Sequence, residues 1–159
     1  MFSFLGEHYG LPITSVSEII RYAQPSATAA ATGEIKGYIN LRGRMLPVVD
    51  LSGRVGGQLE TSAKTRILVV DISNGSLGVI VDTVDGILEV PGEQIEALPH
   101  AGENPLGEEI AVVGDRLIVV IDAERALGGL LPRRPAPRRK TTASRRRTSS
   151  TPRRKASGN

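Results

Sequence analysis

Residues 37–51 read Gly-Tyr-Ile-Asn-Leu-Arg-Gly-Arg-Met-Leu-Pro-Val-Val-Asp-Leu, two apolar runs separated by a charged glycine turn. From Tyr38 to Arg42 polar and aliphatic side chains alternate, which is the period of a strand with one buried face. Gly43 permits the chain to reverse after that strand. Pro47 in the second run lacks a backbone N–H, which predicts an edge strand or a bulge. The stretch therefore predicts a β-hairpin with a polar outer face.

Short strands and turns alternate through the rest of residues 1–131. Asn74-Gly75 separates two apolar runs and is a strong signal for a tight hairpin turn. Short helical turns are expected only after Asp50 and after Asp122, where an aspartate can cap the first turn. The five aromatic residues all lie within the first 38 positions, and their strand-like spacing predicts core positions. The predicted fold class is all-β with short helical turns.

An internal repeat divides this pattern into two copies. At an offset of 68 residues, Gly10, Val16 and Ile19 match Gly78, Val84 and Ile87. At an offset of 72 residues, Arg44, Val48 and Asp50 match Arg116, Val120 and Asp122. Two similar barrels would explain both offsets, and chance similarity among short apolar strands is the alternative.

Charge divides the chain near residue 131. Residues 1–131 hold 9 lysines and arginines against all 17 acids, a net charge of −8, and residues 132–159 hold 11 basic residues and no acid. A body of this size can bury roughly two thirds of its unfolded surface. The tail has no large apolar side chain whose burial would offset the entropy of ordering it. We therefore predict one domain over residues 1–131 and a disordered basic tail over residues 132–159.

The tail carries four basic clusters separated by Pro, Ser and Thr. Such clusters attract polyanions, and the sequence leaves nucleic acid, an anionic membrane and an acidic protein partner open, beside a simple solvated tether. The candidate polyanion-binding residues are Arg133, Arg134, Arg138, Arg139, Lys140, Arg145, Arg146, Arg147, Arg153, Arg154 and Lys155.

Motifs for catalysis and cofactor binding are missing from the sequence. The only histidines, His8 and His100, lie in unrelated contexts, and no nucleophile-elbow or phosphate-loop pattern is present. We therefore predict no enzymatic activity, no cofactor, no metal and no small-molecule substrate. There is no cysteine, no signal peptide and no apolar run long enough to span a membrane, which predicts a soluble cytoplasmic protein.

The segment around Asn40-Leu41-Arg42-Gly43 resembles the corresponding motif of the CheW-like chemotaxis adaptor domain family. Upstream, Tyr9–Ile20 resembles the first hairpin of that family. Downstream, the stretches Thr65–Ile67, Leu77–Val84 and Gly114–Asp122 follow in the family order, so the resemblance covers roughly residues 2–128. It implies two small five-stranded SH3-like barrels packed together.

The resemblance also implies a noncatalytic scaffold that couples the signalling tips of chemoreceptors to the regulatory domain of a chemotaxis histidine kinase. Such a protein would associate with membrane receptor arrays. Alternatives are a polyanion-binding or localisation module that uses the tail, and an adaptor in a non-chemotactic sensory pathway. The receptor-facing candidates are Val16, Glu18, Gly37, Asn40 and Arg42. The kinase-facing candidates are Val84, Asp85, Gly86, Ile87 and Leu88.

Three features depart from the family pattern. The basic tail is an extension that the family core does not require. Residues 25–32 replace a more apolar strand, and the sequence leaves the conformation of residues 23–34 undecided, because their alanines favour helix while the flanking proline and glycine oppose it. Glu34 stands where a bulkier apolar residue is usual.

Overall fold

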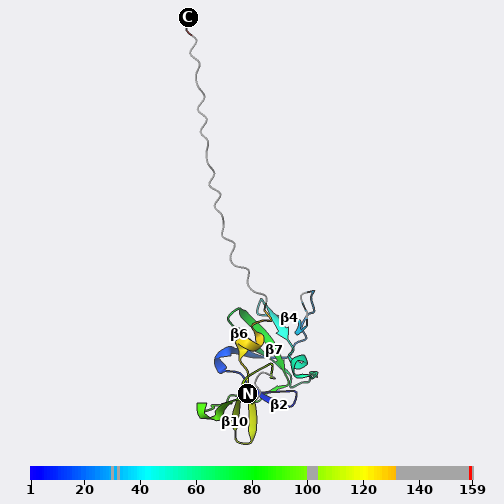
Figure 1. Cartoon of the computed structure of the whole chain (residues 1–159). Coiled ribbons are helices and arrows are strands. Elements are labelled where there is room, and N and C mark those ends of the chain that lie inside the picture. The colour runs from blue at the N-terminus through cyan, green and yellow to red at the C-terminus, as the bar shows by residue number, and fades with distance from the viewer. Residues whose placement is uncertain (30, 32, 100–103, 132–157, 159) are drawn as a thin grey trace.

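The computed structural model describes residues 1–29, 31, 33–99, 104–131 and 158. In this part of the chain there are two β-sheets, three short 3-10 turns and one α-helix (Figure 1). The predicted all-β fold class with short helical turns is confirmed. The tail lies outside the described residues, apart from Gly158.

The first sheet has five strands in the spatial order β3-β6-β7-β5-β4. Neighbouring strands are antiparallel, except for the parallel pair of β5 and β7. The strands are β3 Val16–Arg21, β4 Ile35–Leu41, β5 Arg44–Val49, β6 Arg66–Ile72 and β7 Gly75–Val81, with the 3-10 turns η1 Ile13–Ser15 and η2 Ser52–Val55.

The second sheet has six strands in the order β8-β1-β2-β11-β10-β9, again with a single parallel pair, β11 with β2. Two of its strands, β8 and β9, are short and lie at opposite edges. The elements are β1 Phe2–Phe4, β2 Glu7–Gly10, β8 Thr83–Val84, β9 Ile95–Ala97, β10 Glu109–Val113 and β11 Arg116–Val120, with the 3-10 turn η3 Gly92–Gln94 and the helix α1 Ala123–Leu127.

Strand register confirms the internal repeat. Val48 pairs with Gly78 in one sheet, and Val120 pairs with Gly10 in the other. The repeat matches Gly10 with Gly78 and Val48 with Val120, so the same two positions of the repeat pair in both sheets. The two sheets also carry an equivalent pairing at one edge. Ser26 bridges Tyr38 on β4, and Glu96 on β9 pairs with Ile110 on β10.

Three local predictions are confirmed by the backbone. The hairpin between β6 and β7 turns through Ser73 and Asn74, and Gly75 begins the second strand with φ +142°. The turn η2 forms after Asp50 as predicted, but its N-cap residue is Leu51 and no side chain caps it; the Asp50 carboxylate accepts the Ser52 N–H at 2.9 Å instead. The Asp122 carboxylate accepts the Arg125 N–H at 3.2 Å and caps α1.

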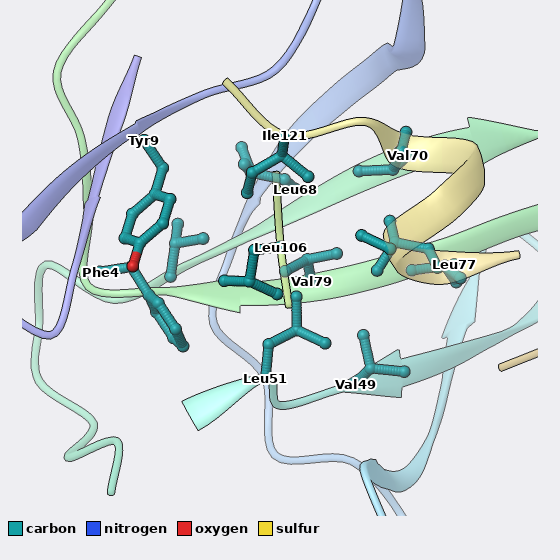
Figure 2. Packing of buried hydrophobic residues seen from close by; sticks show 14 of the residues in the cluster. Phe4, Tyr9, Val49, Leu51, Leu68, Val70, Leu77, Val79, Leu106 and Ile121 are labelled. Carbon is teal, nitrogen blue, oxygen red and sulfur yellow. The ribbon is translucent and has the colours of Figure 1, made fainter. Parts of the chain in front are cut away.

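The main hydrophobic core lies between the two sheets and joins them. Figure 2 shows Phe4 and Tyr9 of the six-stranded sheet packed beside side chains of the five-stranded sheet. Phe2, Phe4 and Tyr9 are each at most 3% exposed and the Tyr9 ring contacts the other two, as expected for core positions. Tyr22 and Tyr38 were also expected in the core but are only half-buried. A smaller cluster of Val48, Ile67 and Ile80 fills the five-stranded barrel. Because one core serves both sheets, we expect them to unfold together.

Three sequence-based expectations are wrong. Short helical turns were expected only after Asp50 and Asp122, yet η1 and η3 also form, each directly after a proline. Pro47 was expected on an edge strand or at a bulge, yet β5 is an internal strand between β7 and β4. The proline is tolerated because the pairing of β5 with β7 begins only at Val48. Tyr9–Ile20 was expected to form a hairpin, but β2 and β3 belong to different sheets, and β2 instead forms a hairpin with β1.

The departures around residue 34 have a structural explanation. No helix forms within described residues 23–29, and Ser26 instead pairs with Tyr38. The Glu34 carboxylate is half-buried and binds both Nε and Nη2 of Arg54, the latter at 2.7 Å. Arg54 also donates to the Ala126 carbonyl oxygen of α1. This bidentate ion pair takes the place of the usual apolar contact, and the bond to Ala126 ties η2 to the helix.

Replacing Arg54 by alanine should reduce the free energy of unfolding by about 1–3 kcal/mol, because it leaves the half-buried Glu34 without its partner. Thermal and urea unfolding would measure this loss. Arg116→Ala is the matched control, since Arg116 is exposed on β11 and should change stability by no more than about 0.5 kcal/mol. Equal losses in the two variants would contradict a structural role for Arg54.

Candidate functional site

The structure brings two of the receptor-facing candidates into direct contact. Arg42 lies in the turn after β4, and Glu18 lies on β3 at the opposite edge of the five-stranded sheet. Nη1 of Arg42 donates to Oε1 of Glu18 at 3.1 Å, and Nη2 binds Oε2. The contact spans the seam where the sheet closes into a barrel. The Arg42 side chain remains 69% exposed, so it is accessible to a partner.

The turn that carries Arg42 has an unusual backbone. Arg42 has φ +50° and Gly43 has φ +82°, as in the primed two-residue hairpin turns. A positive φ is uncommon for a residue with a side chain. The Asn40 side-chain oxygen accepts the Gly43 N–H at 2.8 Å and braces this conformation. Asn40 thus positions Arg42, and we name Glu18, Asn40 and Arg42 together the Arg42 surface.

The other two receptor-facing candidates occupy positions with clear structural roles. Gly37 is buried, with φ +151°, and a Cβ atom there would lie 2.3 Å from the Ser26 carbonyl oxygen. Val16 is half-buried, ends η1 and pairs with Val70 of β6. Neither residue presents a freely exposed side chain. Their place on a partner-binding surface stays a prediction.

Gly37→Ala should reduce the free energy of unfolding by about 1–3 kcal/mol, because the new methyl group would clash with the Ser26 carbonyl oxygen and alanine is strained at this positive φ. Gly92→Ala is the control, since a Cβ at Gly92 meets no atom within 4 Å and the residue has no positive φ. Comparing the urea midpoints of the two variants would measure the difference. Equal midpoints would show that Gly37 is not required by the fold.

The kinase-facing candidates form a loop at the edge of the six-stranded sheet, which we name the Asp85 loop (residues 84–88). Val84 pairs with Phe2, and the Met1 carbonyl oxygen accepts the N–H groups of Asp85 at 3.0 Å and Gly86 at 3.3 Å. The Met1 ammonium donates to the Gly86 oxygen at 2.6 Å. Burial lowers the pKa of this ammonium, and the Asp85 charge partly offsets the effect.

Beyond this anchored segment the loop exposes aliphatic side chains. Ile87 is 76% exposed and Leu88 is 43% exposed. Large aliphatic groups on a fixed loop are available for contact with a protein partner. The Asp85 loop and the Arg42 surface belong to different sheets, which share one core.

Ser3, His8 and Asp85 also come together on the six-stranded sheet, which the sequence pattern did not indicate. The Ser3 hydroxyl donates to Asp85 at 2.9 Å, and Nδ1 of His8 lies 3.3 Å from Ser3 and 3.7 Å from Asp85. In a catalytic triad, serine and aspartate bind different ring nitrogens of histidine. Here one nitrogen faces both residues and the serine proton goes to the carboxylate. The cluster therefore lacks triad connectivity and holds the Asp85 loop to β1.

The described residues offer neither a metal-binding cluster nor a membrane-spanning helix. They contain no group of three or more histidines, aspartates and glutamates arranged to hold a metal ion. No helix among them is long and apolar enough to cross a membrane. The basic clusters predicted to bind polyanions, from Arg133 to Lys155, lie outside the described residues.

Comparison with known proteins matches residues 1–130 to the model of the CheW-like domain. A chemotaxis protein CheW from Klebsiella aerogenes is 30% identical over 131 residues, covering 80% of this chain and 79% of the relative. The Bacillus subtilis chemotaxis protein CheW is also 30% identical over 131 residues, covering 80% and 84%. The crystal structure of the scaffolding protein TtCheW from Thermoanaerobacter tengcongensis superposes with a TM-score of 0.70 and 34% identity, covering 76% of this chain and 85% of that one.

Proposed function

The chain belongs to the CheW-like domain family of chemotaxis scaffold proteins, and from that premise we propose that it couples chemoreceptors to a chemotaxis histidine kinase. The receptor signalling tip binds one barrel, and the regulatory domain of the kinase binds the other. The protein transfers no chemical group. It acts in the cytoplasm, at membrane receptor arrays.

One observation carries this proposal: two surfaces of different character lie on two barrels that share a single core. The Arg42 surface is polar, and its exposed guanidinium is held by Glu18 and Asn40. The Asp85 loop is anchored by Met1 and presents Ile87 and Leu88. A rigid body with two separate contact surfaces is what a coupling scaffold requires.

On the receptor side, Arg42 is the proposed anchor. Its planar guanidinium can bind a carboxylate or backbone carbonyls of the receptor in a directional way. Glu18 orients it in the free protein and can exchange for an acceptor on the receptor. Asn40 acts by holding the turn that carries Arg42. Val16 and Gly37 act through the packing of the strands that support this surface.

On the kinase side, the exposed aliphatic groups of the Asp85 loop supply the contact. Ile87 and Leu88 would bury their apolar surface against the kinase, while the hydrogen bonds of Asp85 and Gly86 to Met1 limit the entropy lost on binding. Coupling follows when a receptor conformation changes the geometry in which the kinase is held.

Two binding measurements with purified components test this division of labour. Arg42→Glu should weaken binding to receptor signalling fragments and leave binding to the kinase regulatory domain unchanged. The double change Ile87→Ser and Leu88→Ser should do the opposite. If either variant lost both partners while still folded, the assignment of separate surfaces would fail.

We further propose that residues 1–131 fold without the basic tail. Leu130 and Leu131 still pack against the main core, whereas the sequence beyond them carries no large apolar side chain. A chain ending at residue 131 should melt cooperatively, within a few degrees of the full-length protein. Calorimetry of both would measure this, and a truncated chain without a cooperative transition would place the boundary elsewhere.

A further inference from the structure

A pocket of about 390 Å³ opens at one end of the five-stranded sheet, where β3 ends at Arg21 and β6 begins at Arg66. Its volume falls within the range of roughly 300–1,000 Å³ that is usual for small-ligand clefts. It lies at the C-terminal end of β3, three residues after Glu18. Its lining residues are Arg21, Tyr22, Ser62, Ala63, Thr65 and Arg66.

The pocket contains an opposed pair of like charges. Arg21 on β3 and Arg66 on β6 are direct cross-strand partners. Like charges at such positions destabilise a strand pair. Within the described residues, neither guanidinium forms an ion pair with a carboxylate. An anion bound between the two arginines would remove their repulsion.

Hydrogen-bond donors at the pocket are held in place by the local turn. Nη1 of Arg66 donates to the carbonyl oxygens of Ala63 and Thr65, both at 2.9 Å, which fixes the guanidinium. Its Nε and Nη2 groups have no hydrogen-bond acceptor among the described residues and can donate to a ligand. The Thr65 hydroxyl oxygen accepts the Ser62 N–H at 2.7 Å, and Thr65 is only 1% exposed. The Ser62 hydroxyl oxygen accepts the Lys64 N–H at 3.2 Å, and the hydroxyl proton is therefore available for donation to a ligand.

We propose that this pocket binds a phosphate group between Arg21 and Arg66, with the Ser62 hydroxyl as a further donor. Guanidinium groups match phosphate oxygens with paired hydrogen bonds. A phosphate monoester near neutral pH carries about 1.5 to 2 negative charges, close to the charge of both arginines, whereas a single carboxylate would balance only one. The volume of the pocket also leaves room for the organic part of a phosphate monoester.

Site-resolved NMR on the full-length protein tests this proposal, because the tail arginines also attract anions and would obscure a bulk measurement. Inorganic phosphate and glycerol 1-phosphate would be titrated separately, with sodium chloride at matched ionic strength as the reference. We expect saturable shifts of the Arg21 and Ser62–Arg66 amide signals with phosphate and not with chloride. Tighter binding of glycerol 1-phosphate would identify a monoester site, and equal binding would identify a site for free phosphate.

Variants make the test sharper. Arg21→Gln should weaken phosphate binding at these amides about tenfold or more, as expected for the loss of charge-assisted hydrogen bonds. Arg116→Gln, at an exposed position on β11, should leave the binding unchanged. Without phosphate, Arg21→Gln should melt at or above the wild-type temperature because the repulsion is gone, and excess phosphate should raise only the wild-type melting temperature substantially. Identical responses to phosphate and chloride, or unchanged binding in Arg21→Gln, would overturn the proposal.

Discussion

Arg42→Glu should reduce receptor-dependent control of the kinase roughly 30-fold, the equivalent of losing an interfacial arginine anchor worth about 2 kcal/mol or more. The new carboxylate would face Glu18 and would repel any acidic acceptor on the receptor. The fold should lose little, because exposed ion pairs contribute only about 0–1 kcal/mol. Kinase activity and melting temperature would be measured on the same preparation.

Two control variants separate binding from stability. Arg44→Glu changes the charge of the neighbouring exposed residue, whose guanidinium makes a long hydrogen bond of 3.5 Å to the Ser76 hydroxyl, and should preserve coupling. The double variant Glu18→Arg with Arg42→Glu restores an ion pair across the seam with reversed polarity. It should regain stability without regaining receptor coupling. If the double variant recovered coupling, Arg42 would act through the fold and not through a receptor contact.

Leu77→Ala should reduce the free energy of unfolding by about 2–5 kcal/mol, the usual cost of truncating a fully buried leucine. Leu77 is 0% exposed and lies on β7, in the core that joins both sheets (Figure 2). At roughly 3–4 °C per kcal/mol for a domain of this size, the melting temperature should fall by about 6–20 °C. Urea unfolding should show a lower midpoint with an unchanged slope if the two sheets unfold together.

Leu117→Ala is the matched control for this loss. Leu117 is the same residue type on β11 but is 59% exposed, so its truncation should change stability by no more than about 0.5 kcal/mol. A second, separate unfolding transition in Leu77→Ala would contradict a shared core. Similar losses in Leu77→Ala and Leu117→Ala would show that burial does not decide the cost.

Local patterns predicted much of the fold because their causes are local. The alternation of polar and apolar side chains from Tyr38 to Arg42 predicts a strand. Asp122, which can cap a first helical turn, predicts where the helix begins. Asn74-Gly75 likewise predicted the β6–β7 hairpin, although the turn itself passes through Ser73 and Asn74. The two offsets of the repeat predicted equivalent strands, which the registers at Gly10 and Gly78 confirm.

Features that depend on closure of a barrel were not predictable in this way. Glu18 and Arg42 were each selected as candidates, but their contact depends on bringing together opposite edges of a sheet. Pro47 was expected at an edge or a bulge because it lacks a backbone N–H, but the position at which β5 begins to pair with β7 is not visible in the sequence. The Ser3–Asp85 contact joins residues from distant parts of the chain, for which a single sequence carries no local signal.

The contact of Glu34 with Arg54 was predictable only in part. The sequence marked it as a departure from the family pattern, and charge in place of an apolar side chain implies a nearby partner. Arg54 is that partner, but several arginines were available and only the structure selects among them. A departure of this kind is therefore a useful signal for a compensating contact, even where the contact itself is not predictable.

Reconstitution of receptor-controlled phosphorylation would show whether this protein couples receptor to kinase. Receptor-containing membranes and the chemotaxis histidine kinase would be combined with and without this protein, and kinase autophosphorylation would be followed before and after addition of receptor ligand. We expect the kinase to respond to the ligand only when the protein is present, and a chain ending at residue 131 to support the same response. A ligand response of equal size without the protein would contradict its role as the coupling scaffold.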